Sequence, residues 1–262
     1  MTPFYFAHGS RRLFGVYNPA SDKAGPVRAA VFCNPFGEEY IHSHRAIRQA
    51  AVMLGAAGVH SLRFDYFGTG DSAGEMQDAD LDIWNEDIRC AIQELRDISG
   101  ADRVTLVGLR LGALLAARAA VVFSDQVDRL ILWDPVLEGQ TYLDEQFRVC
   151  HSPLYFGRGP VPRPDAAGGG FEVAGYSITS RLARDIRELD VRSFAPRLPL
   201  HAFALISGAA EDEVHLRGVF ASIQAQIPIQ RIEGTPCWEP IWPEPVAVIP
   251  AELIKRLVDV TA

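Results

Sequence analysis

The sequence predicts a three-layer α/β/α sandwich built on a mostly parallel β-sheet. Short apolar segments typical of buried strands alternate along the chain with longer segments of helical periodicity. This alternation is the pattern of a parallel sheet covered by helices on both faces. The chain has 262 residues, of which 48% are hydrophobic and 22% charged. A chain of this length and composition can bury a large core, so we do not expect disorder.

The charge balance and the apolar segments argue against two classes of partner. Lys and Arg total 25 against 33 Asp and Glu, so the net charge is -8, and no basic cluster offsets it. Such a chain repels nucleic-acid phosphates. The longest apolar segments, such as Ala29–Cys33 and Ala119–Phe123, are far shorter than the roughly 20 residues that cross a bilayer. Residues 1–10 carry no secretory pattern, so we expect a cytoplasmic protein.

The first half of the chain predicts an antiparallel hairpin followed by strand–helix units. The hairpin falls at Phe4–Tyr17, and the buried strand Ala29–Cys33 ends before the turn residue Gly37. The segment His44–Ala57 has an apolar stripe typical of a helix, with Ser43 placed as its N-terminal cap. The alternation then continues with Val59–Phe64, Asp80–Ile98, Val104–Val107, Ala113–Phe123 and Val127–Trp133.

The pattern breaks between residues 136 and 199. A short amphipathic segment at Leu143–Val149 precedes a stretch rich in Pro and Gly. We therefore expect a lid insertion at 136–199, hinged at Gly168–Gly170, in a single core made of residues 1–135 and 200–262. The remaining elements, alternately helix and strand, are expected at Ser180–Leu189, Leu200–Ile206, Val214–Ala225, Ile227–Ile232 and Ala251–Val258.

The turn after the strand at 104–107 points to a function. Gly108 and Gly112 flank the central residue Arg110, and a helix rich in small residues follows. Two such glycines let strand and helix approach closely, so that the central side chain projects above the sheet. This is the geometry of a nucleophile elbow, whose central residue is ordinarily Ser, Cys or Asp.

The order of the motifs resembles the α/β-hydrolase superfamily over most of the chain. Asn34–Gly37 resembles the oxyanion loop of that superfamily, Phe64–Ser72 resembles its D-x-x-G-x-G-x-S loop, and Ser207–Asp212 resembles its acid loop. The resemblance implies a doubly covered parallel sheet. It also implies a catalytic site made of an elbow nucleophile, a histidine after the last strand and a carboxylate.

A narrower resemblance is to the exosortase A system-associated, hydrolase-like proteins, which also lack the elbow serine. It is carried by Pro35–Glu39, Ser43, Arg45, Gly108–Arg110, Trp133–Pro135 and Ala174–Tyr176. The chain departs from this group at Asn34, where its members tend to carry histidine. The resemblance implies a hydrolase-like protein that could support a biosynthetic or export assembly.

The sequence predicts that a Ser-His-Asp mechanism is absent. Arg110 keeps its proton, because the pKa of arginine exceeds about 12, so it can neither attack a carbonyl nor act as a base. No histidine follows His215. The acid position remains, as Asp212 or Glu211. Losing nucleophile and base together removes on the order of 10⁶-fold of rate in a serine hydrolase.

The remaining groups predict a site for an anionic or acyl-bearing small molecule. Arg110 would anchor the ligand electrostatically, and the backbone N–H groups of Leu111 and of Phe36 or Gly37 would donate to an oxyanion. Candidate acids and bases, and the other expected substrate contacts, are Glu38, Glu39, His42, His44, Asp212, Asp134 and Trp238. No motif implies a metal or another cofactor, and none indicates an oligomeric state.

Three hypotheses for the function stay open at this point. The favoured one is noncovalent acid–base chemistry on an acyl- or carbonyl-containing molecule, such as elimination of an acyl group. The second is a catalytically silent binding or partner protein, in which Arg110 pairs internally with Glu38, Glu39, Asp134 or Asp212. The third is an esterase, thioesterase or acyltransferase whose nucleophile has moved, with Cys33, Cys237 and Ser72 as the candidates.

Overall fold

A computed structural model gives the fold of the chain. It describes residues 1–9, 11–21, 25–150, 170–173, 175–194, 197–199, 201–239 and 248–262. In this part of the chain, eight strands form one sheet in the order β1-β2-β4-β3-β5-β6-β9-β10. The strands are β1 (Thr2–His8), β2 (Arg11–Asn18), β3 (Arg28–Cys33), β4 (Val59–Phe64), β5 (Val104–Leu109), β6 (Val127–Trp133), β9 (His201–Ile206) and β10 (Ile229–Arg231).

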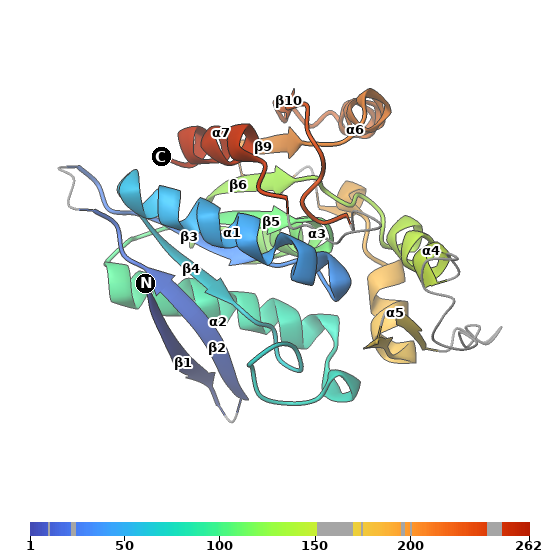
Figure 1. Cartoon of the computed structure of the whole chain (residues 1–262), viewed down its shortest axis with the longest axis horizontal. Coiled ribbons are helices and arrows are strands. Elements are labelled where there is room, and N and C mark those ends of the chain that lie inside the picture. The colour runs from blue at the N-terminus through green and yellow to red at the C-terminus, as the bar shows by residue number, and fades with distance from the viewer. Residues whose placement is uncertain are drawn as a thin grey trace.

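The sheet is parallel except at one side. β4, β3, β5, β6, β9 and β10 pair in parallel, while β1 and β2 form the predicted antiparallel hairpin and β2 pairs antiparallel with β4. Figure 1 shows β3 and β5 side by side in the middle of the sheet, and their residues are buried over almost the whole length of both strands. This is expected of a parallel sheet covered on both faces.

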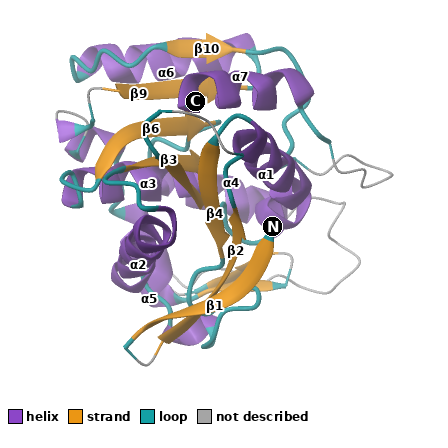
Figure 2. Ribbon diagram, turned by 90° about the vertical axis from the view of Figure 1, so that its left-hand side faces the viewer, coloured by secondary structure: helices purple, strands orange, loops and turns teal. Residues whose placement is uncertain are grey.

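Helices cover both faces and complete the predicted three layers. Figure 2 shows α1 and α7 on one side of the sheet and α2 and α3 on the other. Two separate apolar clusters form beneath these two layers, because successive residues of a strand point to opposite faces. The helices are α1 (Glu38–Ala56), α2 (Leu81–Ser99), α3 (Leu111–Val122), α4 (Gly139–Cys150), α5 (Ser180–Arg187), α6 (Ala210–Ser222) and α7 (Ala251–Thr261).

The segment 136–199 contains more regular structure than the sequence predicted. α4 begins at Gly139, four residues before the amphipathic segment expected at Leu143. A short hairpin of β7 (Phe171–Val173) and β8 (Tyr176–Ile178) precedes α5. In Figure 1, α4 and α5 lie at the end of the sheet toward which β6 and β9 point. The expected hinge residues Gly168 and Gly169 and the motif residue Ala174 lie outside the described residues.

Two helix starts predicted from the sequence are wrong. α1 begins at Glu38 and not at His44, because Gly37 adopts a φ of 60° and turns the chain directly into the helix. Ser43 is therefore a fully buried residue inside α1 and not its cap. α6 begins at Ala210 and not at Val214, since Asp212 accepts a hydrogen bond from the Ala209 N–H and closes the first turn.

No helix among the described residues is both long and apolar enough to cross a membrane. The longest of them, α1 and α2, are amphipathic and pack one face on the sheet.

Buried Asp87 on α2 makes the stability depend on pH. It accepts a hydrogen bond from the Phe67 N–H at 2.8 Å, and burial raises its pKa from 3.8 to about 6. The folded protein binds the proton of the Asp87 carboxyl more tightly than the unfolded chain does. This difference in proton binding therefore stabilises the fold in full below about pH 4, and the contribution is lost as the pH rises through 6. The loss should amount to about 2–3 kcal/mol. Urea unfolding between pH 4 and pH 7 measures it, and Asp87→Asn should remove this part of the slope. An identical slope in the variant would contradict the assignment to Asp87.

Candidate functional site

The turn between β5 and α3 has the geometry predicted for an elbow. Arg110 adopts φ 54° and ψ -122°, a backbone conformation that non-glycine residues rarely enter. A Cβ added at Gly112 would lie 2.2 Å from the Cys33 carbonyl oxygen, and one at Gly108 would lie 2.4 Å from the Gly112 carbonyl oxygen. Glycine is therefore required on both sides, as the spacing indicated. The side chain that this turn carries is a guanidinium.

The Arg110 guanidinium is paired on several sides. Its Nε lies 3.1 Å from Glu39 Oε1 on α1, and its Nη2 lies 2.6 Å from Glu145 Oε2 on α4. Its face lies over the ring of Trp238, with 3.9 Å between the guanidinium carbon and the ring centroid. Burial alone lowers the pKa of Arg110, but the carboxylates of Glu39 and Glu145 outweigh burial and raise it above its ordinary value. Arg110 is thus a permanently charged group with two anionic partners.

Glu39 is held by three donors and is not a free base. Besides Arg110, the Tyr142 hydroxyl donates to it at 3.4 Å and the Gln146 amide donates at 3.2 Å. Burial raises the pKa of Glu39, and the nearby Arg110 charge opposes this rise. Of the carboxylates that the sequence offered as partners for Arg110, the fold selects Glu39 and adds Glu145.

The sequence prediction missed the three α4 residues in this network, which are Tyr142, Glu145 and Gln146. Their spacing of three and four positions places them on one face of a helix. That spacing was the available signal, but it became informative only once α4 was known to start at Gly139.

Asp134 forms the second polar centre of the site. It follows β6 with a φ of 41° and accepts hydrogen bonds from the Ser207 N–H at 2.6 Å, from the Ser207 hydroxyl, and from the Trp238 indole N–H at 3.0 Å. Burial raises its pKa, while the bonds from Ser207 and Trp238 oppose the rise. Trp238 therefore connects Asp134, through its N–H, with Arg110, through its ring face.

Arg110, Glu39, Asp134 and Trp238 line a cavity of about 960 Å³. Its wall also contains Asp212, Glu38 and His42, so the fold brings most of the predicted site residues together. His42 Nε2 lies 3.7 Å from Glu38 Oε1, whereas the observed contact of Asp212 is the helix cap at Ala209. His44 is exposed and bonds the Ile41 carbonyl of its own helix.

Three predicted substrate contacts are not among the residues that line the larger cavity. Phe36 and Gly37 line a second, smaller cavity, and the Leu111 side chain is fully buried beneath the turn. The predicted role of their backbone N–H groups as oxyanion donors stays a prediction.

Carboxylates dominate the wall of the larger cavity. Among the described residues, eight Asp and Glu side chains line it against three arginines, Arg110, Arg148 and Arg231. The charge of Arg110 is already matched by Glu39 and Glu145. The wall therefore favours a neutral or cationic ligand over the anionic one expected from the sequence.

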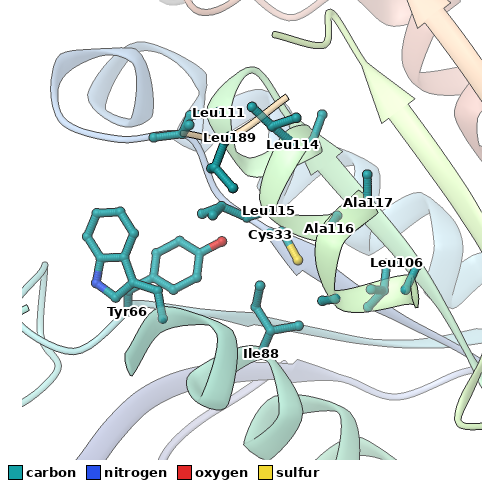
Figure 3. Close-up of a cluster of buried hydrophobic side chains, with 14 of the residues drawn as sticks. Cys33, Tyr66, Ile88, Leu106, Leu111, Leu114, Leu115, Ala116, Ala117 and Leu189 are labelled. Carbon is teal, nitrogen blue, oxygen red and sulfur yellow. The ribbon is translucent and has the colours of Figure 1, made fainter. Parts of the chain in front are cut away.

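The three alternative nucleophiles are not poised for reaction. Ser72 accepts a hydrogen bond from the Phe14 N–H and donates one to the Asp65 carbonyl, which fixes a loop. Figure 3 shows Cys33 inside a cluster of buried side chains, where burial raises its pKa to about 12. Cys237 is also buried, and burial raises its pKa well above the ordinary value. Since the thiolate is the nucleophile, neither thiol is activated.

Alkylation tests this conclusion directly. We expect iodoacetamide to leave Cys33 and Cys237 unmodified in the folded protein, because both thiols are buried and protonated. After unfolding in urea, both should react. Peptide mapping by mass spectrometry gives the modified fraction at each position. Stoichiometric modification of either thiol in the native protein would favour a relocated nucleophile.

Within the described residues, no three His, Cys, Asp or Glu side chains are grouped to hold a metal ion.

Comparisons with known proteins agree with this architecture. A family model for serine aminopeptidase S33 matches residues 26–155, just under half of the chain. Est1E from Butyrivibrio proteoclasticus, solved with ferulic acid, aligns with a TM-score of 0.69 at 18% identity over 98% of both chains. The enol-lactonase from Burkholderia xenovorans aligns at 0.64 and 15% identity over 98% of both. The thioesterase domain of the curacin pathway aligns at 0.62 and 16% identity, covering 100% of this chain and 99% of its own. Among curated proteins, no sequence matches.

Proposed function

This chain has the α/β-hydrolase fold, and from that premise we propose that it binds an acyl- or carbonyl-containing small molecule without forming an acyl-enzyme. The observation that carries the proposal is the connected set Arg110, Trp238 and Asp134. Arg110 stands at the elbow turn, Trp238 follows the last strand β10, and Asp134 follows β6. A hydrolase of this fold would hold its nucleophile at the turn of Arg110 and its histidine after the last strand, where Trp238 lies. Asp134 follows the neighbouring strand β6 and reaches the predicted acid loop through its hydrogen bonds from Ser207.

The set has the connectivity of a triad but not its chemistry. A triad histidine donates one ring N–H to a carboxylate and accepts a proton on its other nitrogen. The Trp238 indole donates to Asp134 in the same way, but indole has no acceptor nitrogen. Arg110 has no lone pair to attack with at neutral pH. The geometry also favours Asp134 over Asp212 as the carboxylate, since Asp212 contacts the α6 start.

The ligand class rests on the cavity and on the neighbours. A cavity of about 960 Å³ is large enough for a molecule of drug size. The structural neighbours include a protein with bound ferulic acid, a thioesterase domain and an enol-lactonase. A carbonyl-containing ligand is consistent with all of these, and the acidic wall favours one that is neutral or cationic.

A second candidate function is noncovalent acid–base catalysis, such as elimination of an acyl group. The observation that favours it is the pair Glu38 and His42, which lie 3.7 Å apart on the wall of the larger cavity. One of them could remove a proton next to a carbonyl while the acyloxy group leaves. The buried Glu39 is less suited to this role, because three donors already occupy it.

The remaining expectations extend the proposal. We place the segment 136–199 as a cap on the larger cavity, because α4 supplies Thr141, Glu145 and Gln146 to its wall. The resemblance to exosortase A system-associated proteins supports a partner role in a biosynthetic or export assembly. A cytoplasmic location is likewise kept as a prediction.

To test the proposal, the protein is incubated with a panel of esters, thioesters and lactones. Mass spectrometry then gives the mass of the native protein, the mass of the denatured protein and the small-molecule products. The proposal expects reversible complexes with no covalent adduct. Elimination products without an adduct would establish the second candidate. A stoichiometric acyl adduct would overturn both. Thr141→Trp should weaken binding by placing a large ring at the cavity wall, whereas Gln140→Trp, at an exposed position of α4 that does not line the cavity, serves as its control.

A further inference from the structure

We propose that a second, smaller cavity in this protein binds a small organic ammonium ion that carries N–H donors. The cavity has a volume of about 190 Å³ and shares no lining residue with the larger one. The turn from β3 into α1 separates them, since Asn34–Gly37 line the smaller cavity while Glu38 and Glu39 line the larger. The proposal is independent of the function proposed above.

The charged group on the wall of the smaller cavity is a buried carboxylate. Asp65 is 7% exposed, and no Lys, Arg or His joins its wall among the described residues. Asp65 accepts hydrogen bonds from the Tyr40 hydroxyl and the Asp71 N–H, both at 3.0 Å, but it forms no ion pair with a described residue. Burial raises its pKa, and the charge of Arg63, which does not line the cavity, opposes this rise only in part. A ligand that brings a positive charge into the cavity would offset more of this burial cost.

A second acceptor on this wall lacks a donor. The Asn34 amide is 3% exposed and donates through Nδ2 to the Phe64 carbonyl at 2.6 Å, which fixes the orientation of the side chain. Its Oδ1 has no hydrogen-bond partner in the structure. An unpaired buried acceptor is costly, so a ligand with N–H donors would relieve the cost. Asn34 and Asp65 together favour a donor over an acceptor.

Aromatic rings form much of the remaining wall. Phe36, Tyr40, Tyr66 and Tyr176 line the cavity, and Phe36 packs edge-on against Tyr176 with 6.0 Å between ring centroids. Ring faces attract ammonium groups. The start of α1 borders the cavity with its partial positive charge, but Glu38 and Glu39 in its first turn offset that charge.

The size of the cavity limits the ligand. A water molecule occupies about 30 Å³ of liquid, so the cavity has room for a group of about five or six heavy atoms. Tert-butylammonium meets this limit. Tert-butanol has the same shape without the charge and serves as its matched control.

Calorimetric titration of the full chain with tert-butylammonium chloride tests the proposal, against sodium chloride at equal ionic strength. We expect saturable binding that is about five- to thirtyfold tighter than that of tert-butanol. Tyr176→Leu should weaken binding of the ammonium by a similar factor, because it removes a ring from the wall. Tyr5→Leu, at an exposed tyrosine on β1, should leave it unchanged.

Two further variants keep the outcome decisive. Asp65→Asn removes the charge, but Asp65 also holds the Asp71 N–H, so the Tyr176 variant decides if Asp65→Asn fails to fold. Thr141→Trp alters the wall of the larger cavity and should leave ammonium binding intact. Binding that does not saturate, that is matched by tert-butanol, or that survives Tyr176→Leu undiminished would overturn the proposal. Binding lost only in Thr141→Trp would assign the ammonium to the larger cavity and overturn it as well.

Discussion

Replacing Arg110 with methionine should destabilise the protein by about 3–5 kcal/mol, the cost of leaving a buried partner charge uncompensated. Glu39 is buried and loses the donor at 3.1 Å, while Glu145 loses the one at 2.6 Å. The Tyr142 and Gln146 contacts to Glu39 then remain as its partners. Urea unfolding followed by circular dichroism at pH 7 measures the loss.

A surface ion pair supplies the control for this prediction. Arg118 pairs with the exposed Asp82, and Arg118→Met should cost no more than about 1 kcal/mol. Adding Glu39→Gln to the Arg110→Met variant should recover part of the lost stability, because the uncompensated charge is removed. If Arg110→Met costs no more than Arg118→Met, the Arg110 network is not a buried charge cluster.

Replacing Gly112 with alanine should destabilise the protein by more than about 4 kcal/mol, or prevent folding altogether. The added Cβ would lie 2.2 Å from the Cys33 carbonyl oxygen and 2.5 Å from that of Asn34. Both atoms are backbone at the end of β3, in the middle of the sheet, so neither can retreat without disturbing strand pairing. Soluble yield and the unfolding free energy report the effect.

Gly218 on α6 is the matched control for this substitution. A Cβ there meets nothing within 4 Å, so Gly218→Ala should stabilise the protein by about 0.5–1 kcal/mol through helix propensity. A Gly112→Ala variant that folds with wild-type stability would show that helix and strand do not approach closely at this turn.

Strain at the elbow links these two predictions. Arg110 holds a left-handed backbone conformation, which costs about 1–3 kcal/mol for a non-glycine residue. Such strain persists only where the surroundings impose it, and here the flanking glycines and the ion pairs do so. The fold therefore maintains this strained turn around a buried and permanently charged side chain.

Local patterns in the sequence predicted much of the fold. The alternation of strands and helices was confirmed, because strand burial and helix periodicity depend on residues near one another in the chain. Gly108 and Gly112 predicted the elbow for the same reason. The starts of α1 and α6 were missed, since Gly37 and Asp212 begin those helices through a backbone turn and a capping bond that apolar periodicity does not register.

The sequence by itself determined the layered sheet, the sharp turn after β5 and the presence of arginine at its centre. Only the tertiary structure decided what that arginine does. Glu39 lies 71 positions from Arg110 and Glu145 lies 35 positions away, so no local pattern relates them. From the sequence alone, Glu38, Glu39, Asp134 and Asp212 were all plausible partners for Arg110. The choice depended on which helices the crossover connections bring to the carboxyl ends of the strands, and that is a property of the folded chain.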